Sequence, residues 1–255
     1  MKITIGGFDG MHLAHQELLK RAEFLVVIEK GSNLTPGLDR CEYTTLPCRF
    51  FILEEIKNLS ALEFIEILKK MGTKSVVIGE DFRFGKNRSG NTELLKKFFE
   101  VEIVKEIKID GIGVHSNVIR EFIKKGEIKR ANRFLGHTYK IKGLHIKGQG
   151  LGSREFVPTI NIQLLKTYVL PKDGVYLSKT NGYNSVTFIG KRSTDENFSI
   201  ETHILDNNWK IADNPVKIEF LDFIRENRKF NSFEELKRAI QKDIKTARIL
   251  LEQKH

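Results

Sequence analysis

The chain has 255 residues, a hydrophobic content of 40% and a net charge of +10. This length suffices for two domains of ordinary size, and no apolar run approaches the roughly 20 residues of a membrane helix. The basic residues are mostly scattered lysines, without the arginine tracts or aromatic strips typical of RNA-binding surfaces. We therefore expect neither a membrane nor a nucleic-acid partner.

Other sequence features indicate where the protein resides. The first strand begins almost at residue 1, so we expect no signal peptide. The two cysteines, Cys41 and Cys48, match no metal-binding spacing and fit a reducing compartment. We expect a cytoplasmic monomer.

Residues 3–15 predict a strand, a glycine-rich turn and the start of a helix. The glycines allow positive φ and close approach of a ligand to the backbone. Backbone N–H groups at a helix start favour an anion, and His12 and His15 share one helix face. This stretch predicts a phosphate cradle containing two imidazoles. Half of a zinc site, or an exposed pair without function, are the alternatives.

Strands and helices alternate as far as residue 135, which predicts a parallel α/β sheet covered on both faces. A long irregular connection is expected over 31–49, and Ser60 with Glu63 forms a capping box. Further strands are predicted at 24–28, 75–79 and 101–109, and helices at 60–71, 91–99, 116–125 and up to 135.

After residue 136 the pattern changes to short alternating runs, which predict a small antiparallel β-barrel. The expected strands are 139–147, 174–179, 185–189, 198–205 and 216–223. A helix beginning after Ser232 closes the chain, with an apolar stripe of Phe233, Leu236, Ile240 and Ile244. We place the domain boundary between residues 136 and 137.

Two further segments follow predicted strands, where ligands of open parallel sheets bind. In residues 79–85, Asp81 and Arg83 alternate with Phe82 and Phe84, and a plain β-turn is the alternative. In residues 114–120, Ser116 and Arg120 lie one helical turn apart, and a simple N-cap with a surface arginine is the alternative.

Together these segments resemble motifs of a known family. Residues 6–15 are similar to the G-x-F-D-G-x-H-x-G-H signature of the nucleotidyltransferase superfamily, in the form found in bacterial bifunctional riboflavin kinase/FAD synthetases. Ala14 stands where that family has glycine. Residues 79–85 match its G-x-D-F-R-F-G segment, and residues 115–120 resemble S-S-x-x-I-R with His115 as the first residue.

The resemblance implies a Rossmann-like nucleotidyltransferase domain over 1–136 that adenylates FMN to FAD with release of pyrophosphate. His12, His15 and Arg120 would be catalytic, and Asp81 and Arg83 would contact flavin. The ATP-binding residues would be Gly6, Phe8, Asp9, Gly10 and Ser116. Residues 29–48 lack the family's aromatic-x-Pro-x-Pro element.

The second half resembles the family's riboflavin kinase domain, here residues 137–255. A glycine-rich loop with Gly148, Gly150 and Gly152 precedes a segment like G-F-P-T-A-N, in which Phe156 replaces the first glycine. By resemblance, Thr159 and Asn161 hold Mg²⁺ and ATP, Glu201 takes the proton from the riboflavin hydroxyl, and Phe198 and Arg225 contact flavin. From the residues alone, the loop could be a hairpin connection and Glu201 could face solvent.

We therefore predict a Mg²⁺-dependent bifunctional enzyme with ATP, riboflavin, FMN and FAD as substrates and products. One rival is an enzyme in which one half has decayed, with the N-terminal site the suspect because of Ala14 and the altered 29–48 connection. The other rival is a non-catalytic nucleotide- or RNA-binding regulator on the same fold.

Overall fold

A computed structural model describes residues 1–146, 157–193, 195–206 and 215–253. The chain forms two compact units, Met1–Val118 and Ile119–His255. The division falls within helix α5 (Ser116–Lys124), ahead of the boundary predicted between residues 136 and 137. No helix in the described ranges is both long and apolar enough to cross a membrane.

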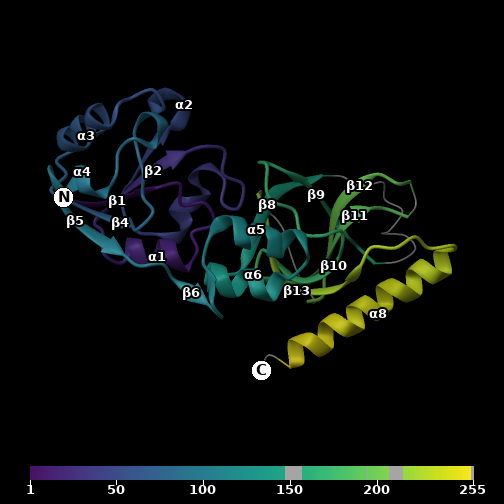
Figure 1. Cartoon of the computed structure of the whole chain (residues 1–255). Helices are drawn as coiled ribbons and strands as arrows, with labels where there is room; N and C mark the ends of the chain where they lie inside the picture. The colour runs from purple at the N-terminus through teal and green to yellow at the C-terminus, as the bar shows by residue number, and fades with distance from the viewer. Residues whose placement is uncertain (147–156, 194, 207–214, 254–255) are drawn as a thin grey trace. The chain divides into compact units, whose positions relative to one another are not determined.

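The first unit contains a five-stranded parallel sheet with β1 at its centre (Figure 1). The chain places β2 and β3 on one side of β1, then β4 and β5 on the other. Strand order therefore reverses beside β1, and the crevice at the carboxyl ends of β1 and β4 is where such sheets bind ligands. The strands are β1 (Lys2–Gly6), β2 (Phe24–Glu29), β3 (Cys48–Ile52), β4 (Ser75–Gly79) and β5 (Glu100–Val104).

Both faces of this sheet are covered, as predicted. In β2 the side chains alternate: Val26 joins a cluster with Phe64 and Leu68 of α3, whereas Leu25 joins a separate cluster with Leu19 of α1. The predicted capping box on α3 is present. The helices of this unit are α1 (Leu13–Leu19), α2 (Leu53–Ile56), α3 (Ala61–Lys70) and α4 (Thr92–Lys96), with short 3-10 helices at Gly37–Tyr43 and Lys86–Arg88.

Two predictions for this unit were wrong. The irregular connection over 31–49 ends in strand β3, which pairs with β2 at the sheet edge. This strand follows Pro47 directly, and its five residues are too few to show the two-residue period of a strand. The single strand expected over 101–109 is instead β5 followed by a small hairpin of β6 (Lys108–Ile109) and β7 (Ile112–Gly113).

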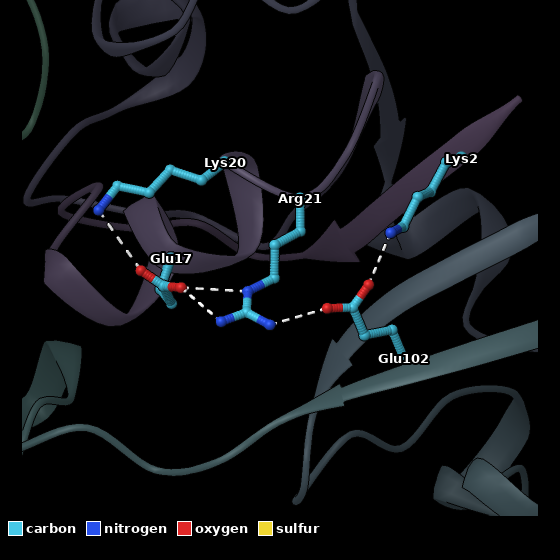
Figure 2. Close-up of polar contacts among 5 residues, drawn as sticks. All are labelled: Lys2, Glu17, Lys20, Arg21 and Glu102. Atoms are coloured by element: carbon cyan, nitrogen blue, oxygen red, sulfur yellow. Dashed lines mark hydrogen bonds and ion pairs between the residues drawn. The ribbon is translucent and has the colours of Figure 1, made fainter.

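A chain of charged side chains fixes the far end of α1 against the sheet (Figure 2). Glu102 on β5 binds Lys2 of β1 at 2.6 Å and Arg21, just past α1, at 2.8 Å. Arg21 in turn binds Glu17 of α1 at 2.7 Å. These contacts are partly exposed, so each stabilises weakly, but together they orient α1 on the sheet.

The second unit is a closed six-stranded antiparallel barrel in the order β10-β11-β12-β9-β8-β13. The sequence predicted five of these strands and missed β9, which is short and begins right after the Pro158-Thr159 segment. The strands are β8 (Tyr139–Ile146), β9 (Ile160–Leu164), β10 (Gly174–Thr180), β11 (Tyr183–Lys191), β12 (Phe198–Ile204) and β13 (Val216–Glu226).

Five buried hydroxyls form a closed ring of hydrogen bonds inside the barrel. Ser178 contacts Ser185 at 2.8 Å and Thr187 at 2.7 Å, and Thr180 contacts Ser185 at 2.9 Å. Thr202 closes the ring, 2.8 Å from Thr180 and 3.0 Å from Thr187. All five residues are fully buried, so this part of the core is polar but satisfied within the ring.

Helix α8 (Phe233–Glu252) packs on the outer surface of the barrel. Its buried residues are Ala239, Asp243 and Ala247, whereas Phe233, predicted to be part of the apolar stripe, is 52% exposed. Phe233 is the first residue of the helix, ahead of its first buried residue, Ala239.

Helix α6 (Ile128–Leu135) also packs on the barrel. The Asn132 side chain donates to the Phe220 carbonyl of β13 at 2.8 Å and accepts from the Tyr139 amide of β8 at 2.7 Å. Phe134 and Leu135 are buried. These contacts explain why the second compact unit includes a helix that the sequence analysis assigned to the first domain.

Candidate functional sites

The turn between β1 and α1 has an unusual backbone. Phe8 and Met11 both adopt positive φ (51° and 43°) although they are not glycine, and Gly10 has a φ of 88°. Both non-glycine side chains are buried, and this packing holds their backbone in place. Strained backbone that is held by packing is typical of functional sites.

Asp9 ties this turn to the connection that follows β2. Its carboxylate accepts from the amides of Leu34 and Thr35, each at 2.9 Å, and the Gly10 amide donates to Thr35 Oγ1 at 2.8 Å. We predicted Asp9 among the phosphate-binding residues, but its carboxylate is buried and already binds backbone amides. We therefore assign it to shaping the turn.

His12 and His15 lie together at the start of α1. Their rings stack with centroids 3.5 Å apart, and His12 Nδ1 accepts from the His15 amide at 3.4 Å. His15 Nδ1 is buried and has no hydrogen-bond partner in the described part of the chain. Burial first, and then nearby positive charges including Arg40, hold the pKa of His15 well below its ordinary 6.5.

The zinc alternative lacks the other ligands it would need. Among the residues that the structure describes, no three His, Cys, Asp or Glu side chains gather in a way that could hold a metal. The histidine pair therefore presents a neutral, partly buried imidazole beside a strained turn, which suits hydrogen bonding to an anion.

The third predicted segment meets the first. Ser116, at the start of α5, donates from its hydroxyl to the Asp9 carbonyl at 2.7 Å. This bond joins two segments more than 100 residues apart in the chain at the β1 turn. Arg120 follows Ser116 by one helical turn but belongs to the second compact unit, and its role stays a prediction.

The second predicted segment forms a turn held by aromatic packing. Phe84 is buried and stacks on Phe82 with ring centroids 5.8 Å apart. Asp81 and Arg83 are exposed, and Arg83 donates to the Phe82 carbonyl at 2.8 Å. The fold of this segment is the β-turn that we considered as the alternative, and a flavin role for the two charged residues stays a prediction.

The connection after β2 contains a buried arginine that the sequence analysis did not predict. Arg40 is completely buried and its Nη1 donates to Glu29 at 2.7 Å, while Nε and Nη2 have no partner in the described ranges. Glu29 also accepts from the Gly31 and Ser32 amides. Burial opposes ionisation of Glu29, but these bonds, led by that from Arg40, lower its pKa to about 2.

On the barrel, Glu201 and Asn161 are direct cross-strand partners in the β12–β9 ladder. The neighbours of Glu201 in β12, Ile200 and Thr202, are buried inside the barrel, so strand alternation places Glu201 on the outer face. Its side chain is 22% exposed, and Arg192 Nη1 lies 3.5 Å from its carboxylate. The face of Glu201, which the sequence left ambiguous, is therefore the outer one.

Residues around this pair complete the barrel site. Thr159 directly precedes β9, two residues before Asn161. The carbonyl of its neighbour Pro158 lies 2.8 Å from His203 Nδ1 of β12. Phe198 is exposed at the start of β12. Gly148, Gly150, Gly152 and Phe156 lie outside the described residues.

Arg225 has a structural partner. Its guanidinium donates to both carboxylate oxygens of Asp243, at 2.9 and 2.8 Å, which attaches α8 to β13. Asp243 is buried, so this bidentate contact accounts for the charge of Arg225. The flavin contact predicted for Arg225 stays untested, and we do not include it among the proposed roles.

Comparison with known proteins matches a family to each half of the chain. Residues 135–251 match the riboflavin kinase family and residues 47–118 match the FAD synthetase family. The chain is 31% identical over 291 residues to the bifunctional riboflavin kinase/FMN adenylyltransferase of Haemophilus influenzae, covering 96% of this chain and 92% of that protein. This chain belongs to the bifunctional riboflavin kinase/FMN adenylyltransferase family.

A second relative and a solved structure are also similar to this chain. The enzyme of the same name from Listeria monocytogenes is 31% identical over 284 residues, covering 94% of this chain and 89% of the relative. A crystal structure described as a macrolide-efflux protein from Streptococcus pneumoniae shares the fold, with a TM-score of 0.84 and 27% identity over 97% of this chain and 93% of that one. The FAD synthetase match ends at Val118, where the first compact unit ends.

Proposed function

We propose that the barrel phosphorylates riboflavin to FMN and that the first unit adenylates FMN to FAD, both with ATP. The observation that carries this proposal is the pairing of Glu201 with Asn161 on the outer face of the barrel, in a chain that belongs to the bifunctional family. The stacked histidines at the β1 turn support the second activity independently.

In the kinase reaction, the riboflavin 5′-hydroxyl oxygen attacks the terminal phosphorus of ATP and Glu201 accepts the hydroxyl proton. The bond from that phosphorus to the bridging oxygen breaks, and ADP leaves with the electron pair. A hydroxyl is a weak nucleophile, so a positioned base accelerates this step. Arg192, 3.5 Å away, steadies the carboxylate, and Arg192 is itself held by Asp195 at 2.7 Å. The exposed Phe198 lies on the same strand and offers a flat apolar surface to the flavin.

The family implies a Mg²⁺ ion, and the donor set on the barrel suits one. Thr159, Asn161 and Glu201 can each offer an oxygen ligand, which suits Mg²⁺. Because only one of the three is charged, the ion would also keep bound waters and bind phosphate oxygens of ATP. Thr159 and Asn161 would hold the ion, which neutralises phosphate charge when bound.

In the adenylyl transfer, the FMN phosphate attacks the α-phosphate of ATP and pyrophosphate leaves. The attacking phosphate is already ionised, so alignment and charge stabilisation matter more than a base. His12 and His15 bind the nucleotide phosphates, and Ser116 fixes the turn that presents them. Further proposed contacts are Gly6, Phe8, Gly10 and Arg120 with ATP, and Asp81 and Arg83 with flavin.

The structure weakens the argument for a decayed first site. Ala14, which replaces the family glycine, lies within α1 and does not adopt positive φ. A glycine is therefore not required there by the backbone. We further propose a cytoplasmic monomer that acts on small molecules without a nucleic-acid partner.

Two single substitutions in the full chain test these assignments. Glu201→Gln should lower the rate of FMN formation by about 10²–10⁴-fold, the usual contribution of a general base, and leave the conversion of FMN to FAD unchanged. His15→Ala should lower the rate of FAD synthesis by about 10²–10³-fold and leave the rate of FMN formation unchanged. If either variant loses both activities equally while remaining folded, the assignment of that residue to one site is wrong.

A further inference from the structure

Lys30 follows β2 directly, at the edge of the sheet where the β1 turn lies. Strand β2 pairs in parallel with β1, and Gly6 at the end of β1 lies opposite Val27. Lys30 is therefore three residues beyond the position that is level with the end of β1. Ligands of open parallel sheets bind at this carboxyl edge, beside the strand where the strand order reverses. The position of Lys30 thus makes it a candidate for contact with a substrate.

The Lys30 side chain extends over the β1 turn. A Cβ at Gly7 would lie 3.3 Å from Cε of Lys30 and 3.9 Å from its Nζ. Because Gly7 has no side chain, the stem of the lysine lies directly over the backbone of the turn. Burial is the main cause of the low pKa of His15, and the positive charge of Lys30 adds to it. The ammonium is thus close enough to act on the proposed adenylyl-transfer site.

The charge of Lys30 is left without a counter-charge in the described part of the chain. Its side chain is exposed and forms no ion pair or hydrogen bond there. Glu29, the preceding residue, accepts from Arg40 at 2.7 Å and from the Gly31 amide at 2.9 Å. Asp9 in the β1 turn accepts from backbone amides of the connection. Both carboxylates are therefore already bound, and the ammonium stays available to an anionic ligand.

The backbone at Lys30 is held by the turn that follows it. Gly31 has a φ of 80°, a conformation that favours glycine. The Glu29 carboxylate accepts from the amides of Gly31 and Ser32 at 2.9 and 3.1 Å, which closes a turn around Lys30. The base of the lysine is therefore fixed, and its flexible four-carbon stem lets the ammonium adjust to a ligand above the turn.

The adenylyl-transfer reaction brings two polyanions together, and the assignments above leave the phosphate of FMN without a cation. The ATP phosphates are assigned to His12, His15 and Arg120. Of the residues proposed for the flavin, only Arg83 is positive, and its guanidinium already donates to the Phe82 carbonyl at 2.8 Å. Phosphate groups that approach each other closely enough to react repel strongly unless a positive group offsets their charge.

Building on that adenylyl-transfer site, we propose that Lys30 binds the phosphate of FMN through its ammonium. In the reaction, an oxygen of this phosphate forms a bond to the α-phosphorus of ATP, and the bond from that phosphorus to the bridging oxygen breaks. Pyrophosphate leaves with the electron pair, and Lys30 keeps its proton throughout. The ammonium offsets the repulsion between the two substrates and aligns the attacking oxygen. The contact also distinguishes FMN from riboflavin, which has no phosphate to bind.

The test compares Lys30→Ala, Lys30→Gln and Lys30→Arg with the wild type in FAD synthesis from added FMN and ATP. Lys74→Gln is the matched control, because Lys74 is also exposed, has no side-chain partner in the described ranges, and precedes β4 at the opposite edge of the sheet. KM is measured for FMN and for ATP. Lumiflavin, a flavin without the ribityl phosphate, serves as a competitive inhibitor against FMN. Melting temperatures establish that each variant is folded.

We expect Lys30→Ala and Lys30→Gln to raise KM for FMN by about 10- to 100-fold, as for loss of a hydrogen bond between charged groups. KM for ATP and the inhibition constant of lumiflavin should stay at their wild-type values, because neither ligand contacts Lys30. Lys30→Arg keeps the positive charge and should restore most of the affinity for FMN.

A rise in KM for ATP with KM for FMN unchanged would assign Lys30 to ATP and overturn the inference. A parallel loss of inhibition by lumiflavin would assign the contact to the flavin ring, which overturns it as well. If all three Lys30 variants match Lys74→Gln while His15→Ala has lost FAD synthesis, the inference fails and the proposed site stands. If His15→Ala is also fully active, the proposed adenylyl-transfer site itself is wrong.

Discussion

Replacing Glu29 by glutamine should destabilise the first unit and reduce FAD synthesis, while riboflavin phosphorylation remains. Glu29 holds the only ion pair of Arg40 in the described part of the chain, at 2.7 Å, and the Arg40 side chain is completely buried. The substitution therefore leaves a buried positive charge without a counter-charge. Removing one partner of a buried pair typically costs 3–5 kcal/mol. Because Glu29 itself is 19% exposed, we expect the lower end, about 3 kcal/mol.

The cost should depend on pH in a defined direction. The pKa of Glu29 is lowered to about 2 in the folded chain, from an ordinary value of 4.5 in the unfolded chain. Such a group contributes its full stabilisation above pH of about 4.5 and loses it as pH falls toward 2. The stability difference between the wild type and Glu29→Gln should therefore be constant near neutral pH and shrink below pH of about 4.5.

Calorimetric unfolding of the full chain from pH 3 to 8 measures this difference. Glu66→Gln is the matched control, since Glu66 pairs with Lys69 at 2.8 Å in an exposed position, where pairs are worth about 0–1 kcal/mol. A Glu29→Gln variant as stable as the control, or a difference that does not shrink in acid, would refute the reasoning about Arg40.

Three further substitutions or truncations probe the barrel. Asn132→Ala removes the hydrogen bonds of the Asn132 side chain to β8 and β13. It should lower the free energy of unfolding by about 1–3 kcal/mol and speed hydrogen exchange at the Tyr139 amide, and unchanged exchange would contradict this role. Thr202→Val opens the hydroxyl ring and leaves Thr180 and Thr187 with one ring partner each, so urea unfolding should show a loss of about 1–3 kcal/mol. An equally stable variant would mean that the hydrogen bonds of Thr202 contribute nothing to stability. A fragment of residues 119–255 should fold and phosphorylate riboflavin. Its melting temperature should exceed that of a fragment of residues 137–255, which lacks the buried residues of α6, and equal melting temperatures would support the later boundary.

The sequence predicted the architecture well wherever local pattern and burial agree. The buried β-branched runs of β1 and β4, and the alternation of β12, follow directly from side-chain period, and both halves of the chain were assigned the correct fold class. The motif at residues 6–15 also indicated a tight turn with two adjacent imidazoles, and the structure stacks them.

The features that sequence could not reveal are long-range pairings of polar groups. An arginine in a connection rich in turn residues is normally exposed, so nothing in the local pattern indicates that Arg40 is buried against Glu29. Likewise, the role of Asp9 depends on amides 25 residues away or more, and that of Asn132 on strands beyond the predicted boundary. The pairing of β3 with β2 arises from the sheet as a whole, because five residues are too few to show a period.

The most direct test is a steady-state assay of the purified full-length chain with riboflavin, ATP and Mg²⁺, in which FMN and FAD are resolved over time. Our account predicts that FMN appears first and FAD follows, that excess chelator stops FMN formation, and that added FMN and ATP yield FAD without riboflavin. FMN that accumulates with no FAD would show that the first site has decayed, and the absence of both products from a folded protein would contradict the proposed function altogether.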